Sequence, residues 1–182
     1  MGFARFSPLF LLLALPVSAV CQTAPPAPGL NFLYHLNSTL GETLSFGPGP
    51  SGTQLSIPIL GGTLTGPRIS GKMAYMYVVD EVKYILTYLP GKVMDVGADW
   101  GTIDTNGTFQ ANAQYQVQTD DGANIFVHVT GPTQPNGQVY NHITFSTGSE
   151  KYYWMNNIVA VGISTLGTTS VAVDAWEMVA PS

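Results

Sequence analysis

The chain has 182 residues, a formal net charge of −5 and only 9% charged residues, whereas aromatic residues make up 11%. This length predicts one domain. The chain lacks any cluster of Lys and Arg, which argues against nucleic-acid binding, because neutralising phosphates needs clustered positive charge. A weakly charged, aromatic-rich chain suits apolar or sugar-like small molecules better.

The N-terminal segment is typical of a secretory signal peptide. Arg5 provides a basic start, Leu9–Leu15 an apolar run, and Val17 and Ala19 the small residues of a cleavage site. The apolar run is too short to cross a bilayer, so we expect no membrane span. The predicted segments are a signal peptide over residues 1–19, a Pro-rich leader over 20–29 and one domain over 30–182. We therefore expect the protein to be secreted or held in the lumen of the secretory pathway.

Two further features of the sequence agree with secretion. Cys21 is the only cysteine and lies next to the predicted cleavage site, so we expect the mature domain to fold without disulfides. Asn37 and Asn106 each begin an Asn-x-Ser/Thr sequence, which makes both predicted glycosylation sites.

Alternation of apolar and polar residues, separated by Gly, Pro and Asp turns, predicts strands rather than helices. Phe109–Thr119 has the cleanest pattern, because its odd-numbered residues are apolar from Phe109 to Val117 and its even-numbered residues are polar. The Asp-Asp-Gly turn after it predicts a hairpin with the next strand. The predicted strands cover residues 31–37, 54–59, 62–65, 109–119, 124–130, 139–146, 158–164 and 170–179.

These short strands without crossover helices predict an all-β fold, a single antiparallel β-barrel with one apolar insertion. A closed barrel also hides its strand edges without needing disulfides. The insertion is Ala74–Leu89, which is apolar and aromatic and fits either a short helix or a hairpin. It is interpreted either as a lid over a pocket or as a subunit interface.

Four motifs occur in a fixed order in the sequence: Gly61–Arg68, Gly97–Trp100, Thr119–Gly122 and Tyr153–Asn156. Together they resemble the DUF3237 family, also called UPF0311, over about Leu33 to Glu177. The resemblance implies a small antiparallel β-barrel, often oligomeric. The signal peptide and the extra residues between Gly71 and Val96 depart from the family pattern. Such a secreted, fungal-looking member is similar to small pericyclases that perform hetero-Diels–Alder couplings on tropolone sesquiterpenoids.

Asp99 and Arg68 are the first candidate catalytic residues. Arg68 is the only arginine after the signal peptide; it fits either an ion pair with Asp99 or Asp120 or an anchor for a substrate carbonyl. Asp99 and Trp100 fit a turn cap and a core aromatic, or else an acid beside an aromatic wall for the substrate. A carboxyl in an apolar barrel mouth would have a raised pKa and could donate a proton near neutral pH.

Asp120 and His128 are the remaining candidate catalytic residues. Asp120-Asp121-Gly122 fits a hairpin turn first, with Asp120 as a site acid in the alternative. His128 fits a hydrogen-bond donor or a general acid or base. His35, His128 and His142 lack the spacing of a zinc site, so no metal is expected.

The aromatic run Tyr152–Asn157 fits either an interface or core plug, or a pocket wall for a flat substrate. In the second interpretation Trp100, Tyr115, Tyr153, Trp154 and Asn156 bind the substrate.

The favoured function is a biosynthetic enzyme without cofactor that binds a small apolar metabolite and catalyses a cyclisation or a (hetero-)Diels–Alder cycloaddition. The sequence contains no Gly-x-Ser-x-Gly, Walker, Rossmann or His-Glu-x-x-His motif, which disfavours hydrolase, kinase and dehydrogenase activity. The alternatives are a non-catalytic binding module for small molecules or sugars, and a structural protein. We expect a homo-oligomer.

Overall fold

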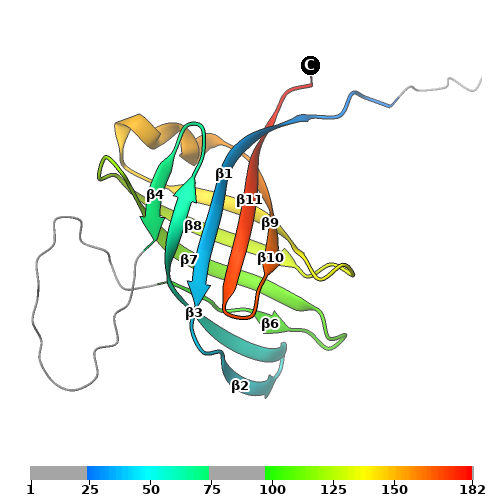
Figure 1. Cartoon of the computed structure of the whole chain (residues 1–182). Helices are drawn as coiled ribbons and strands as arrows, with labels where there is room; N and C mark the ends of the chain where they lie inside the picture. The colour runs from blue at the N-terminus through cyan, green and yellow to red at the C-terminus, as the bar shows by residue number, and fades with distance from the viewer. Residues whose placement is uncertain (1–23, 74–96, 182) are drawn as a thin grey trace, which may run out of the picture.

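A computed structural model describes residues 24–73 and 97–181 of the chain. Within them the structure is built almost entirely from antiparallel strands (Figure 1). The strands are β1 (Gly29–Leu40), β2 (Leu44–Gly49), β3 (Gly52–Thr65), β4 (Ser70–Met73), β5 (Ala98–Asp99), β6 (Thr102–Ile103), β7 (Phe109–Thr119), β8 (Asn124–Pro132), β9 (Val139–Ser146), β10 (Ala160–Leu166) and β11 (Ser170–Val179). A 3-10 helix, η1 (Glu150–Asn157), connects β9 to β10.

The sheet closes into a barrel because β1 pairs with two strands at once. It pairs with β11 along most of its length, and with β3 from His35 opposite Thr65 to Leu40 opposite Ile59. The eight strands around the described barrel follow the order β1, β11, β10, β9, β8, β7, β4, β3 and back to β1. The predicted all-β antiparallel barrel is therefore confirmed.

One position in the barrel wall is shared by three short strands. β4, β5 and β6 each pair with β3 on one side and with β7 on the other, one after another along the same line. Residues 74–96 separate β4 from β5, and the predicted apolar insertion Ala74–Leu89 lies outside the described residues. The insertion therefore joins the barrel within a strand position and not at a hairpin tip.

The strand pattern read from the sequence matches the inside and the outside of the barrel. In β7 the side chains of Ala111, Tyr115 and Val117 are buried and those between them are more exposed, as predicted. The hairpin between β7 and β8 is also confirmed, with a bond from the Gly122 N–H to the Thr119 carbonyl and a left-handed φ of 88° at Gly122. The predicted separate strands 54–59 and 62–65 are one strand, β3.

The two ends of the barrel differ. At one end η1 follows β9 and packs Tyr152 and Met155 into the core. At the other end, where β1, β8 and β10 finish and β7, β9 and β11 start, the barrel holds a cavity. The core lies between the two ends and joins side chains from β1, β3, β7, β8, β9, β10 and β11.

Candidate functional site

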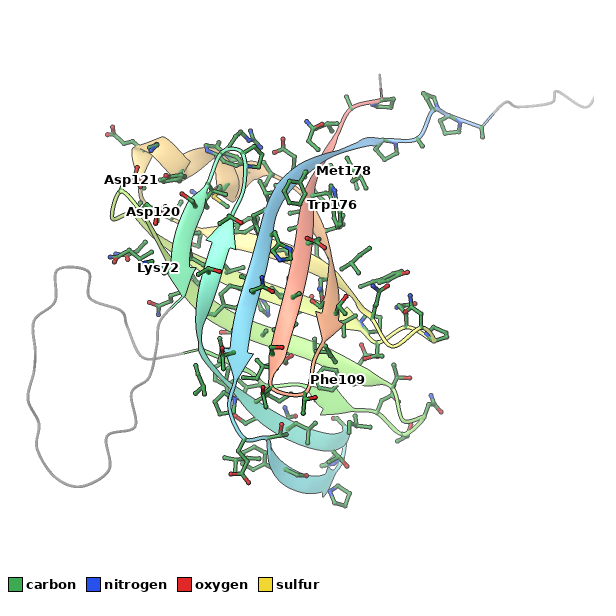
Figure 2. All side chains as sticks on the ribbon, in the orientation of Figure 1. Lys72, Phe109, Asp120, Asp121, Trp176 and Met178 are labelled. Atoms are coloured by element: carbon green, nitrogen blue, oxygen red, sulfur yellow. The ribbon has the colours of Figure 1, made fainter. Side chains whose placement is uncertain are left out.

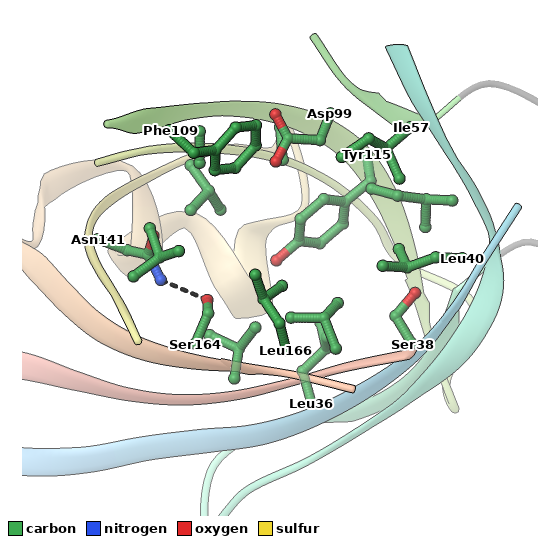
Figure 3. Close-up of a pocket in the computed structure, with 17 residues that line it drawn as sticks. Leu36, Ser38, Leu40, Ile57, Asp99, Phe109, Tyr115, Asn141, Ser164 and Leu166 are labelled. Atoms are coloured by element: carbon green, nitrogen blue, oxygen red, sulfur yellow. Dashed lines mark hydrogen bonds between the residues drawn. The ribbon is translucent and has the colours of Figure 1, made fainter. Parts of the chain in front are cut away.

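The cavity at the open end is an almost wholly apolar pocket with a few polar groups in its wall (Figure 3). Its free space is about 640 Å³ when the open mouth is counted. Aliphatic and aromatic side chains from seven of the barrel's long strands make most of the wall, and β5 contributes Asp99. The polar members of the lining are Ser38, Asp99, Tyr115, Asn141 and Ser164. Asp99 is the one carboxyl among these lining residues.

Asp99 reaches the pocket because of its register in the wall. It lies opposite Ala113 of β7, and Ala113 lines the same cavity, so both side chains face inward. The Asp99 Oδ1 accepts a hydrogen bond of 2.8 Å from the Asn112 backbone N–H. Burial raises the pKa of the Asp99 carboxyl above its usual 3.8, and the bond from Asn112 only partly opposes that shift. The site therefore shifts the Asp99 carboxyl toward its protonated form, relative to a carboxyl in water.

Tyr115 places a phenol beside this acid. Figure 3 shows its ring extending into the cavity from the same wall as Asp99. Burial raises the pKa of Tyr115, so its hydroxyl keeps its proton at any physiological pH. The hydroxyls of Tyr34 and Tyr115 lie close enough to each other to affect both pKa values. Neither hydroxyl has a hydrogen-bond partner elsewhere among the described residues.

Asn141 and Ser164 form a second polar feature of the pocket, which the sequence analysis missed. Asn141 Nδ2 donates to Ser164 Oγ at 2.5 Å, and both residues are buried. The Asn141 Oδ1 has no partner among the described residues, and an unpaired buried acceptor costs about 1–3 kcal/mol. The available signal was a polar residue at an inward position of a strand whose other inward residues, Val139, Ile143 and Phe145, are apolar.

Arg68 does not form the predicted ion pair with Asp99 or Asp120. It lies in the loop between β3 and β4, donates to Glu177 Oε2 at 2.5 Å, and stacks its guanidinium over the Trp154 ring with 3.9 Å to the centroid. Glu177 is an inward residue of β11 with 8% exposure. This cluster lies at the end of the barrel that η1 covers, away from the cavity.

Asp120 also lies far from the pocket. Figure 2 shows Asp120 and Asp121 at the opposite end of the barrel from Phe109, which lines the cavity. Asp120 accepts from the Ser70 hydroxyl, and Asp121 accepts from Lys151 and Tyr152. Both carboxylates therefore tie the β7–β8 turn to neighbouring segments, and the structure does not bring Asp120 together with Asp99.

Of the predicted substrate-binding residues, only one lines the cavity. Tyr115 lines the cavity, whereas Trp100, Tyr153, Trp154 and Asn156 do not. Trp100 is 37% exposed on the wall, and Tyr153 is 57% exposed on η1. The Asn156 side chain accepts from the Thr147 N–H and donates to the Thr147 carbonyl, which fixes η1 to the end of β9. Of the two interpretations of Tyr152–Asn157, the structure favours the plug.

The histidines lie on the outside of the barrel wall. His128 sits between the buried Val127 and Val129, and its Nε2 pairs with Asn112 Oδ1 at 2.8 Å. It therefore contacts the residue that holds Asp99, but not the cavity. His35 pairs with Asp174 on the neighbouring strand at 2.6 Å. In residues 24–73 and 97–181 no group of three or more His, Cys, Asp or Glu side chains is arranged to hold a metal ion.

The predicted glycosylation sites differ in their surroundings. Asn106 is exposed in the turn between β6 and β7. Asn37 is exposed in the middle of β1, and its Nδ2 lies 3.0 Å from His35 Nε2. Among the described residues no helix is long and apolar enough to span a membrane. Secretion itself stays a prediction, because residues 1–19 lie outside the described residues.

The fold and the cavity define this protein as a small closed antiparallel β-barrel with an acid-bearing apolar pocket at one end. The chain belongs to the DUF3237 family of proteins of unknown function, whose model matches residues 28–141 and 132–178. The resemblance read from the four motifs is thereby confirmed.

Sequence relatives include one enzyme. A protein named hydroalkoxylation enzyme phnH, from Penicillium herquei, is 31% identical over 159 residues, which are 87% of this chain and 88% of that protein. A UPF0311 protein from Bradyrhizobium diazoefficiens is 24% identical over 170 residues, covering 84% and 98%. The first similarity supports an enzymatic, cyclase-like role.

Solved structures show the same barrel. A β-barrel-like protein from Acinetobacter baumannii superposes with a TM-score of 0.70 at 25% identity, covering 86% of this chain and 99% of that one. An enzyme from Penicillium herquei superposes with a TM-score of 0.63 at 26% identity, covering 86% and 98%.

Proposed function

We propose that this protein is an enzyme that closes a ring in an apolar metabolite by adding a hydroxyl group across a carbon–carbon double bond of the same molecule. The observation that carries the proposal is Asp99, a carboxyl with a raised pKa on the wall of a mostly apolar pocket. The similarity to a hydroalkoxylation enzyme supports the same reaction class.

The pocket contains the groups that such a reaction needs. Protonated Asp99 would donate its proton to one alkene carbon while the hydroxyl oxygen forms a bond to the other. The hydroxyl proton then leaves and restores the carboxyl, so a C–H and a C–O bond form, the alkene π bond and the O–H bond are consumed, and no electrons are gained or lost. Because both reacting groups belong to one molecule, a pocket that holds them in contact removes much of the entropic barrier.

A hetero-Diels–Alder reaction is the second candidate, because the same walls could hold a diene and its partner. The hydroxyls of Tyr115 and protonated Asp99 both face the cavity and could donate hydrogen bonds to the carbonyl of a heterodiene. The two reactions differ in one measurable way, since a cycloaddition transfers no proton to carbon.

The test uses ortho-prenylphenol, whose ring closure gives a dimethylchroman of the same mass. We expect the purified protein to accelerate this conversion, followed by liquid chromatography and mass spectrometry. In deuterium oxide the Asp99 carboxyl exchanges its proton, so the product should carry a single deuterium on carbon. Deuterium-free product would contradict the proton-transfer step.

Asp99→Asn should lower the rate by about 100-fold or more, which is the usual range for loss of a general acid. The amide has the same shape and can still accept from the Asn112 N–H, so the fold should survive. Asp120→Asn is the matched control, because Asp120 lies at the other end of the barrel. Equal rates for Asp99→Asn and the unaltered protein would overturn the proposal, and binding without any conversion would favour a carrier.

A further inference from the structure

Asn141 stands out among the inward residues of β9. Strand β9 alternates strictly between buried and exposed positions, and Asn141 occupies a buried one between Val139 and Ile143. A Val or Leu there would continue the apolar wall and would carry no unpaired oxygen of its own. The amide is 5% exposed and lines the cavity.

Ser164 gives this amide one orientation. Ser164 lies on β10 opposite Val139, two residues along β9 from Asn141, and its Oγ accepts from Asn141 Nδ2 (Figure 3). With the nitrogen used in this way, the oxygen is the atom without a partner. A buried carbonyl oxygen fixed by a bond to its nitrogen is a preorganised acceptor.

The protein provides no donor for this acceptor in the part of the chain that the structure describes, because no side chain or backbone group there donates to Asn141 Oδ1. The rest of the lining is apolar apart from Ser38, Asp99, Tyr115 and Ser164, so a ligand that fills the cavity must be mostly apolar. A single hydroxyl on such a ligand would meet Asn141 Oδ1 with little competition from water.

We propose that Asn141 is a specificity-determining residue that binds the hydroxyl group of an apolar substrate through its Oδ1 atom. This inference rests on the proposed function, in which that hydroxyl is the group that adds to the double bond. An amide oxygen does not take up the proton, so Asn141 is a positioning residue that directs the hydroxyl oxygen, whereas the proton exchange belongs to Asp99. The pocket therefore selects phenols and alcohols over their ethers.

The test compares two probes that differ in the donor alone, 1-naphthol and 1-methoxynaphthalene, by equilibrium dialysis with the purified protein. We expect the unaltered protein to bind the naphthol about tenfold more tightly, since a buried site that is built to pair a hydroxyl rejects the analogue that lacks it. In Asn141→Leu the two probes should bind alike. Ser164→Ala should reduce the preference, because it frees the amide to rotate.

Four outcomes would overturn the proposal. An equal affinity of the unaltered protein for both probes would remove its basis, and so would a preference for the ether. A preference that persists in Asn141→Leu but is lost in Asp99→Asn would assign the hydroxyl to Asp99. A purely structural role for Asn141 predicts a lower melting temperature of Asn141→Leu with an unchanged preference, whereas we expect the melting temperature to hold and the preference to vanish.

The result can be separated from that of the proposed function, because dialysis measures binding and not conversion. If ortho-prenylphenol is not converted but the preference for naphthol depends on Asn141, the hydroxyl-binding role of Asn141 is supported and the proposed ring closure is contradicted. If conversion depends on Asp99 but the preference for naphthol does not depend on Asn141, the proposed ring closure is supported and the hydroxyl-binding role of Asn141 is contradicted.

Discussion

At the scale of single residues, Asp99 shows how a barrel wall can raise the pKa of a carboxyl group. Its inward register comes from pairing with Ala113, and its surroundings are the apolar lining of the cavity. Losing water disfavours the carboxylate more than the acid, which is why the pKa of Asp99 rises. Such a group costs stability when it is ionised, so function and stability are opposed at this position.

This opposition predicts a pH-dependent effect of Asp99→Asn on stability. The pKa of Asp99 is raised in the folded state, so the folded protein binds more protons than the unfolded chain as the pH passes from the usual 3.8 to the raised value. Unaltered Asp99 therefore loses stability as the pH rises through that window. Thermal unfolding between pH 4 and pH 8 should show the variant at least as stable as the unaltered protein, with the gap widening toward neutral pH.

A gap that widens toward acid would instead mean that the carboxylate is favoured in the folded state. Asp121 provides the opposite reference within the same chain. Hydrogen bonds from Lys151 and Thr119 lower the pKa of Asp121 to about 2, and its variant should gain no stability at neutral pH.

At the scale of elements, the strands that could be predicted are those with a repeating pattern and a turn at each end. Phe109–Thr119, Val139–Ser146 and Ser170–Val179 were predicted with the bounds that the structure has. Strands β4, β5 and β6 have two to four residues each, too few for a period to show. They exist because β3 and β7 offer them hydrogen bonds on both sides, which is information from tertiary structure.

The site could be predicted only where a local pattern reports an inward position. Asp99 and Tyr115 were predicted as candidates because Asp99 belongs to the distinctive acidic motif Gly97–Trp100 and Tyr115 lies in a clean alternation. The partner of Arg68 could not be predicted, because Glu177 lies 109 residues away in the sequence and no local pattern connects the two residues. The many aromatic residues of η1 could not show whether the segment closes the end of the core or lines a pocket, because both roles need the same residue types.

Gly62 explains why the Gly61–Arg68 motif needs glycine, and it carries a prediction about closure of the barrel. A Cβ at Gly62 would lie 2.1 Å from the Asn37 carbonyl oxygen of β1. Gly62→Ala should therefore push β1 from β3 where the barrel closes, and lower the free energy of unfolding by about 1–3 kcal/mol. Urea unfolding measures the change.

Gly148→Ala is the control, because a Cβ there meets no atom within 4 Å. Its free energy of unfolding should stay within about 0.5 kcal/mol of the unaltered protein. Equal losses for the two variants would show that close approach of β1 and β3 is not the reason for the glycine.

At the scale of the whole molecule, one end of the barrel is closed by packed side chains and ion pairs, and the other end holds the cavity. The end covered by η1 is held by the buried Tyr152 and Met155, by the Arg68–Glu177 pair and by Asp121 with its three donors. The open end holds Asp99, Tyr115 and the Asn141–Ser164 pair around the cavity. Residues with catalytic chemistry in the sequence occur at both ends, but only those at the open end share a space that a substrate could occupy.

This division predicts that stability and ligand binding can be changed separately. Met155 is a buried residue of η1 with 1% exposure, so Met155→Ala should cost about 2–5 kcal/mol of unfolding free energy and leave the affinity for 1-naphthol unchanged. Leu166 lines the mouth of the cavity and is 49% exposed. Leu166→Ala should weaken 1-naphthol binding by about three- to tenfold through lost apolar contact, with less than about 1 kcal/mol lost from unfolding.

Met155→Leu keeps the volume of the side chain and should cost less than about 1.5 kcal/mol, which separates loss of packing from any particular need for sulfur. Urea unfolding and equilibrium dialysis on the same preparations give both quantities for each variant. If Met155→Ala weakened naphthol binding as much as Leu166→Ala does, the two ends would be coupled. The plug would then set the shape of the cavity, and Trp154 and Asn156 would again be candidates for contact with the substrate.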